Sequence, residues 1–188
     1  MAINRQAITT AEFETFINLP EHADTLFELI GGEIIDVPSN PYASYIASKI
    51  LGYLFMYLLT NNIGWTTTEA GGYVVAGENY APDVAFVSYT KQKQPAKQGY
   101  NPNPPDLAVE VVSSESRTEN EKLTIKLGNY LAVDTLVWIV RPEKGYIEVH
   151  QVGQKVRTYR RGDIIQGGDL LPDFELAVAN ILDDPDEA

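Results

Sequence analysis

Helical periodicities and short apolar runs alternate along the chain, and this pattern predicts a mixed α/β fold. TTAEFETF is typical of a short helix that Thr9 and Glu12 open as a capping box. LFELI and EIIDV flank Gly31 and Gly32, which predicts a β-hairpin with a glycine turn. From Pro41 a long helix is predicted, with an apolar stripe at Ile46, Ile50, Tyr53, Leu54 and Tyr57.

The middle of the chain predicts strands interrupted by one long loop. The segment WTTTEAGGYVVA favours a strand pair or one long broken strand. PDVAFVS (82–88) and DLAVEVVS (106–113) each predict a short strand. Between them, KQKQPAKQGYNPNPP (91–105) is a loop rich in proline, lysine and glutamine, and it is long for a compact domain.

The C-terminal half continues the alternation. Thr118 and Glu121 form a second possible capping box, so we expect a helix from there to about Val133. TLVWIV (135–140) is typical of a fully buried strand. YIEVHQV and KVRTYR predict a closing hairpin, and the rest a C-terminal appendage. Without a visible linker, residues 1–188 are expected to form one domain, a mixed sheet flanked by helices with an acidic tail at 183–188.

Composition narrows the class of protein. The 188 residues are 44% hydrophobic and 10% aromatic, which excludes a disordered chain. No run of about 18 uninterrupted apolar residues predicts a membrane span, and MAINRQAITTAEFETF lacks the apolar core of a secretory leader. The absence of cysteine excludes zinc–thiolate sites and favours a reducing compartment, the cytoplasm. With only His22 and His150, a histidine-rich metal site is excluded.

The charge is large but unevenly distributed. A net charge of −12 argues against non-specific binding to nucleic acid. Residues 1–90 hold 2 basic and 10 acidic residues, whereas residues 91–161 hold 12 basic and 8 acidic ones. A local phosphate-binding site is therefore compatible with the sequence, although charge alone does not establish it.

Glu110 lies between valines in DLAVEVVS, where a buried carboxylate without a partner is costly. Asp106 shares its face of the strand but lies about 13 Å away at strand rise, so a partner must come from another element. Asp83, in PDVAFVS, is the neighbouring candidate. Acids side by side on strands about 4.8 Å apart are able to hold one hard cation such as Mg²⁺. The alternative is that Asp83 only begins a strand and that Glu110 faces solvent.

A lysine on the following helix is the next candidate. The apolar face of that helix carries Leu123, Leu127, Tyr130 and Leu131. Lys126 borders this face and is able to reach back toward a metal-bound water, whereas Lys122 lies further round and is expected in solvent. The alternative for Lys126 is a lysine whose stem is buried and whose ammonium is solvated. Glu28, in LFELI, is a further candidate for a buried acid in the same cleft, and Glu33 is expected to be exposed.

These residues resemble a known motif. Pro82-Asp83 followed by Glu110-Val111-Val112 is similar to the PD-(D/E)XK motif of the restriction-endonuclease-like nucleases. More closely, residues 20–150 resemble the Uma-type family of uncharacterised endonucleases. The resemblance rests on FELIGGEI, PDVAFVS, PDLAVEVVS, IKLGNYLAV and LVWIVRP, in this order. It implies a restriction-endonuclease-like core and metal-dependent phosphodiesterase activity.

The resemblance also implies roles for individual residues. Asp83 and Glu110 match the acids of the motif, and Glu28 matches a family acid in the first hairpin. The usual lysine position is occupied by Val112, but in this branch a lysine on the following helix takes the role, and Lys126 matches it.

The chain departs from the family pattern at three further places. A histidine common near the start of the long helix is absent from PYASYIAS. Arg141 stands where an aspartate is usual, and Val133-Asp134 replaces Gly-Val. The missing histidine leaves no residue for any role that it has in the family.

The leading hypothesis is a nuclease that hydrolyses DNA, rather than RNA, with Mg²⁺ or Mn²⁺. Asp83, Glu110 and the carbonyl of Val111 would hold the ion, and Lys126 would position the attacking water or stabilise the transition state. The predicted phosphate contacts are Lys91, Lys93, Lys97 and Arg117. A homodimer is expected by analogy, because cleavage of two strands generally needs two active sites.

Two other functions stay open. The net charge and Val112 favour a non-catalytic dimeric scaffold or interaction module that retains the nuclease fold. Binding of nucleic acid without cleavage is weakened by the charge of −12 and by the lack of a dense basic helix.

Overall fold

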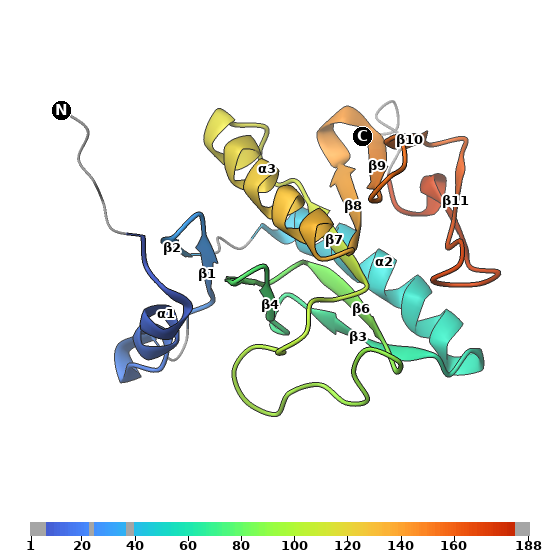
Figure 1. The fold of residues 1–188 in the computed structure, drawn as a ribbon. Helices are drawn as coiled ribbons and strands as arrows, with labels where there is room; N and C mark the ends of the chain where they lie inside the picture. The colour runs from blue at the N-terminus through green and yellow to red at the C-terminus, as the bar shows by residue number, and fades with distance from the viewer. Residues whose placement is uncertain (1–6, 23–24, 37–39, 183–188) are drawn as a thin grey trace.

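The computed structural model describes residues 7–22, 25–36 and 40–182, and the predicted acidic tail lies outside them (Figure 1). The chain begins with α1 (Thr10–Ile17). The Thr9 side chain accepts a hydrogen bond from the backbone N–H of Glu12, and the Glu12 carboxylate accepts one from the backbone N–H of Thr9, so the first predicted capping box is confirmed. A short 3₁₀ turn, η1 (Pro20–His22), follows.

A six-stranded mixed sheet forms the centre of the molecule, in the order β10-β9-β8-β7-β6-β3. Its strands are β3 (Gly64–Thr68), β6 (Val84–Ser88), β7 (Leu107–Val111), β8 (Leu136–Arg141), β9 (Tyr146–His150) and β10 (Arg157–Arg160). β7 and β8 pair in parallel, and the other neighbours are antiparallel. The parallel pair requires a crossover, which α3 (Arg117–Ala132) supplies, so the predicted mixed sheet with helices is confirmed.

A four-stranded sheet lies beside it, with the order β2-β1-β5-β4. Its strands are β1 (Phe27–Ile30), β2 (Glu33–Asp36), β4 (Tyr73–Val75) and β5 (Glu78–Tyr80). Gly31 and Gly32 join β1 to β2 with φ of 60° and 75°, a left-handed turn that glycine adopts readily and that confirms the hairpin prediction. WTTTEAGGYVVA divides between the two sheets, because β3 joins the central sheet and β4 the smaller one.

Two helices cover opposite faces of the central sheet (Figure 1). α2 (Pro41–Thr60) confirms the predicted long helix. Its buried residues are Ala43, Ile46, Ala47, Ile50 and Leu54. Tyr53 is 39% exposed, so the stripe prediction was wrong there. The buried face of the helix is centred closer to Ala43 and Ala47 than predicted, and Tyr53 lies outside it.

The second predicted capping box was also wrong. Ser116 is the N-cap of α3, and its side chain accepts from the backbone N–H of Glu119. Two S/T-x-x-E matches overlap here, and the one that starts two residues earlier caps the helix, so Thr118 lies in the first turn instead.

The C-terminal segment is part of the core rather than an appendage. After η2 (Pro142–Lys144) and the predicted β9–β10 hairpin come β11 (Ile164–Gln166), β12 (Glu175–Ala177) and η3 (Val178–Asn180). They bury apolar side chains against α2 and the central sheet, namely Ile165, Leu171, Phe174, Leu176, Val178, Ile181 and Leu182. On the other face, Tyr130 of α3 packs with Tyr73, Val75 and Tyr80 of the smaller sheet.

By length and composition, α2 is apolar enough to cross a membrane, and no other helix in the described ranges meets this test. Its most apolar window has a mean hydropathy of 1.2 and is 28% buried. Core helices of soluble proteins pass the same test, and α2 contacts β3, β6 and β7. One face of α2 therefore lies in the core, and the rest of its surface is unusually apolar.

Candidate active site

The register of the central sheet places the two motif acids across from each other. β6 and β7 are antiparallel, with Val84 opposite Val109 and Ala85 opposite Ala108. The same register continued by one residue puts Asp83 opposite Glu110. Asp83 Oδ2 accepts a hydrogen bond of 2.6 Å from the backbone N–H of Val111, which ties it to the end of β7. The neighbouring strands thus place the two acids next to each other.

Lys126 is the charged partner of Glu110. Its ammonium donates to Glu110 Oε2 at 2.8 Å and to Glu28 Oε1 at 2.9 Å, and the lysine side chain is only 8% exposed. Glu28 Oε1 also accepts from the backbone N–H of Ala81 at 2.7 Å. Three distant elements, β1, β7 and α3, therefore meet at one buried ion pair. We call Glu28, Asp83, Glu110 and Lys126 the Lys126 cluster.

Two tyrosines of the core contact this cluster. Tyr130 donates to Glu110 Oε1 at 2.9 Å, so both oxygens of Glu110 have partners. The Lys126 ammonium also lies 5.6 Å from the centre of the Tyr80 ring. Sequence reasoning had assigned Tyr130 to the apolar face alone. Its position four residues after Lys126, on the same side of the helix, was the available signal.

The cluster opens into a pocket of about 340 Å³ between β1, the start of α2, the end of β7 and α3. Six acids line it: Glu28, Asp36, Glu69, Asp83, Glu110 and Glu119. The two lysines are Lys122 and Lys126. Lys122 was expected in solvent, but it lies on the pocket wall and pairs with Glu119 at 2.8 Å. The pocket therefore carries a clear excess of acidic groups.

Burial and negative neighbours disfavour a full set of ionised carboxylates. Burial raises the pKa of Asp83 to about 6. Burial also raises the pKa of Glu110 above its usual range, and the charges of Glu28 and Asp83 act in the same direction against the stabilising Lys126. For Lys126, burial lowers the pKa, but Glu110 and Glu28 outweigh it and hold the pKa above the usual lysine value. The lysine is therefore charged, and the acids share less charge than their number implies.

The donor set fits a hard divalent cation. Carboxylate and carbonyl oxygens are the ligands that Mg²⁺ and Mn²⁺ prefer. Asp83 and Glu110, with the carbonyl of Val111, are the residues that would hold the ion. Within the described part of the chain, no three acidic, histidine or cysteine side chains form a ready metal-ligand group. A bound ion would thus need Glu110 to exchange a present hydrogen bond for a metal bond.

The predicted phosphate contacts lie outside this pocket. Lys91 pairs with Asp106 at 2.9 Å and donates to the carbonyl of Pro105. Lys93 and Lys97 are exposed on the long loop. Arg117 is exposed on α3 and pairs with Glu121 at 2.7 Å. None of the four lines the pocket, so their contact with a nucleic-acid backbone remains a prediction.

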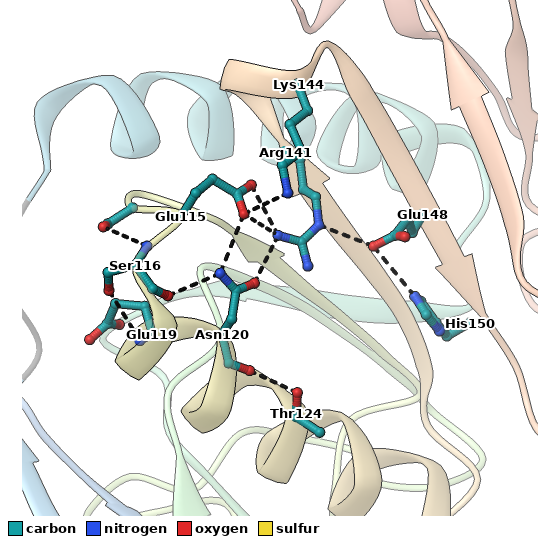
Figure 2. Close-up of polar contacts among 10 residues, drawn as sticks. Glu115, Ser116, Glu119, Asn120, Thr124, Arg141, Lys144, Glu148 and His150 are labelled. Carbon is teal, nitrogen blue, oxygen red and sulfur yellow. Dashed lines mark hydrogen bonds and ion pairs between the residues drawn. The ribbon is translucent and has the colours of Figure 1, made fainter.

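A second charged group joins β8 and η2 to the segment that opens α3 (Figure 2). Arg141 donates to both oxygens of Glu115, at 2.9 and 3.0 Å, and to Glu148 at 3.2 Å. Lys144 donates to Glu115 at 2.8 Å. Burial opposes ionisation of Glu115, but hydrogen bonds from Lys144 and Arg141 outweigh it and lower its pKa. We call Glu115, Arg141, Lys144 and Glu148 the Arg141 cluster.

The Arg141 cluster also reaches the first turns of α3. Arg141 donates to the side chain of Asn120 at 3.1 Å. Asn120 bonds back to the carbonyl of Ser116, the N-cap of α3 (Figure 2). The arginine therefore fixes the start of the helix that carries Lys126.

Comparison with known proteins agrees with the fold and gives the family. A solved structure described as "a putative nuclease belonging to DUF820", from Anabaena variabilis, matches with a TM-score of 0.76 and 20% identity, over 93% of this chain and 97% of that one. At this identity the likeness shows a shared fold. No curated protein matches. Residues 13–179 match the Uma2 family, described as "Putative restriction endonuclease", and the chain therefore belongs to the Uma2 family.

Proposed function

We propose that the protein is a metal-dependent nuclease that hydrolyses phosphodiester bonds in DNA and works as a cytoplasmic homodimer. The observation that carries this proposal is the buried Lys126 ammonium, 2.8 Å from Glu110, in an acidic pocket with Asp83. Membership of a family described as restriction endonucleases supports the same reaction class. A lysine beside two acids at the ends of two neighbouring inner strands provides the charges that phosphodiester cleavage needs.

A substrate phosphate needs a counter-charge in this pocket. Six acids against two lysines would repel a phosphodiester. A divalent ion held by Asp83 and Glu110 would neutralise phosphate charge and lower the pKa of water when bound. Burial is the main reason that the pKa values of the two carboxyls are raised, and nearby acids add to the effect. A bound cation would offset both causes, so the raised values support a site that takes up a cation.

In this proposal, Lys126 takes the role of the motif lysine. Val112 occupies the motif position and packs against the second core cluster. Lys126 reaches the same acids from α3. Glu28 holds the Lys126 ammonium, while Ala81 holds Glu28 through its backbone N–H. The ammonium is thereby oriented to donate hydrogen bonds to an attacking water or to a phosphate oxygen.

Cleavage assays on matched variants test the proposal. The wild type should cleave plasmid DNA with Mg²⁺ or Mn²⁺, and Asp83→Asn and Glu110→Gln should lose at least about 100-fold in rate. Lys126→Arg keeps the charge but changes the donor geometry, and should lose cleavage while retaining Mn²⁺ binding. Lys155→Ala should remain active, because Lys155 is exposed and does not line the pocket. A single-stranded RNA substrate in parallel distinguishes the two nucleic acids.

The alternative is a non-catalytic scaffold, and one observation favours it. Lys126 and Glu110 already satisfy each other, with Tyr130 completing the hydrogen bonds, so the cluster is able to serve the fold alone. A wild type that neither binds Mn²⁺ nor cleaves any nucleic acid would support the scaffold. Equal cleavage by wild type and Lys126→Arg would remove the proposed role of the lysine.

A further inference from the structure

The outward side of α2 is apolar and lies open to solvent. Six large apolar side chains on this helix are between 39% and 65% exposed: Tyr42, Tyr45, Tyr53, Phe55, Met56 and Leu59. The opposite side of the same helix buries Ile46, Ile50 and Leu54 completely. α2 thus has two apolar sides, and the fold of one chain covers only the inner one. We call the residues from Tyr42 to Leu59 on the open side the outer face of α2.

The outer face follows the spacing of a helix–helix seam. The exposed residues Tyr45, Ser48, Gly52, Phe55 and Leu59 are separated by three, four, three and four positions. This 3-4 repeat keeps a stripe aligned along a partner helix, as in left-handed helix pairs. A helix that faces only water has no need for such a stripe.

The centre of the stripe is small, and its ends are large. Ser48 and Gly52 lie in the middle, and a Cβ added at Gly52 would meet nothing within 4 Å in the described part of the chain. Glycine inside a helix is less favourable than alanine, and no contact among the described residues requires it. Close approach of a second helix would require it. If two copies of α2 cross antiparallel near residue 50, Tyr45 meets Phe55 of the partner subunit, and Ser48 meets the partner's Gly52.

Such a contact is complementary to itself, as a two-fold interface must be. Charge also favours a second copy. α2 has 20 residues and no acidic one, in a chain with a net charge of −12. Two such chains repel each other over most of their surfaces, and an uncharged face lets them approach. The one charged residue, Lys49, lies 4.3 Å from the centre of the Tyr45 ring and donates to the carbonyl of Ile181.

The available area is sufficient for a dimer. Large aromatic side chains bury about 150–250 Å² each, so six half-exposed side chains offer about 600 Å² on one chain. Two copies would bury about 1,200 Å², the lower limit of stable interfaces. Residues around the helix would add to this area.

We propose that the outer face of α2 is the homodimer interface, in which two α2 helices pair antiparallel about a two-fold axis near Ser48 and Gly52. A homodimer is expected for a nuclease, and the proposal assigns its interface to one surface. It rests on α2 alone, so it stands or fails independently of cleavage.

Oligomeric state tests the interface directly. Sedimentation of the full chain should give twice the monomer mass of 20.8 kDa at micromolar concentration. Phe55→Glu should raise the dissociation constant at least about 100-fold, because it places a charge in the seam. Val152→Glu, on an equally exposed apolar residue away from α2, should leave the dimer intact. A dimer that persists in Phe55→Glu would overturn the proposed surface.

The absence of cysteine allows a test of helix direction. In the double variant Ser48→Cys with Gly52→Cys, mild oxidation should cross-link most of the protein as dimers, and each single variant should cross-link several-fold less. Equal cross-linking by Ser48→Cys alone would overturn the antiparallel arrangement. A wild type that stays monomeric and floats with phosphatidylcholine vesicles would overturn the dimer and assign the outer face to lipid.

Discussion

Two charged clusters contact α3 or the residues just before it, and they differ in the ratio of cations to acids. The Arg141 cluster opposes two cations to two acids, and the pKa of Glu115 is lowered because its hydrogen bonds outweigh burial. The Lys126 cluster opposes one cation to three acids, and the pKa values of Asp83 and Glu110 are raised. A balanced cluster is complete without a ligand and holds the fold together. The Lys126 cluster has more acids than cations, so it is able to accept a further cation. This difference in charge distinguishes the candidate site from the Arg141 cluster, which stabilises the helix beside it.

The largest expected effect is removal of the lysine. Lys126→Met leaves Glu28 and Glu110 buried without a counter-charge, so the free energy of unfolding at pH 8 should fall by about 3–5 kcal/mol. At pH 5 Glu110, whose pKa is raised, takes up a proton, and the loss should be smaller. Urea unfolding at the two pH values measures both quantities, and an equal loss at both would contradict the charge argument.

Breaking the balanced cluster should cost less. Arg141→Met should lower the free energy of unfolding by about 1–3 kcal/mol, because Glu115 keeps Lys144 and part of its solvent. The gain in melting temperature on adding Mn²⁺ should stay as in the wild type, since the metal ligands are untouched. The double variant with Glu115→Gln should lose less than the sum of the single variants. If Arg141→Met loses the increase in melting temperature on adding Mn²⁺, the two clusters are coupled.

Glu110→Gln should separate metal binding from stability. Without metal, the variant should be as stable as the wild type or more stable, because it relieves the crowding of acids around one lysine. The wild type should gain about 2–3 kcal/mol from Mn²⁺ at a hundred times the dissociation constant. Thermal melts with and without Mn²⁺ measure this gain. If Glu110→Gln retains it, the ion binds elsewhere.

The smallest expected effect is the release of protons when Mn²⁺ binds. Asp83 with a pKa of about 6 and Glu110 with one of about 7 are partly protonated at pH 6.5 and ionised at pH 8.5. Mn²⁺ binding should therefore release between about 0.5 and 1 proton at pH 6.5 and almost none at pH 8.5. Calorimetry in buffers of different ionisation enthalpy counts these protons. No release at pH 6.5 would show that the ligands are already ionised.

The same raised pKa values set the sign of stability against pH. Between about pH 4.5 and 7, the unfolded chain holds fewer protons on these two carboxyls than the folded chain does. Their contribution therefore makes the metal-free protein less stable as pH rises through this range. Saturating Mn²⁺ should flatten this dependence, because the ion favours the ionised forms.

Much of the local structure followed from the sequence. The capping box at Thr9 and the turn at Gly31 and Gly32 were predicted correctly, because their hydrogen bonds and left-handed φ angles depend on neighbouring residues. The alternation of side chains along the strand predicted which residues share a face with Glu110. Helical spacing predicted that Lys126 borders the apolar face of its helix. The family resemblance drawn from five short segments was also confirmed.

Other features depended on how distant elements meet. Nothing local to Lys122 indicated its place on the pocket wall, and nothing local to Arg141 indicated that it fixes the start of α3. The C-terminal segment had no long periodic run, yet it closes the core because α2 leaves apolar surface beside it. A sequence pattern determines which way a side chain points within its own element. The register of β6 and β7, and the packing of β1 and α3 beside them, decided which side chains face each other, because contacts between elements far apart in the chain have no local signal.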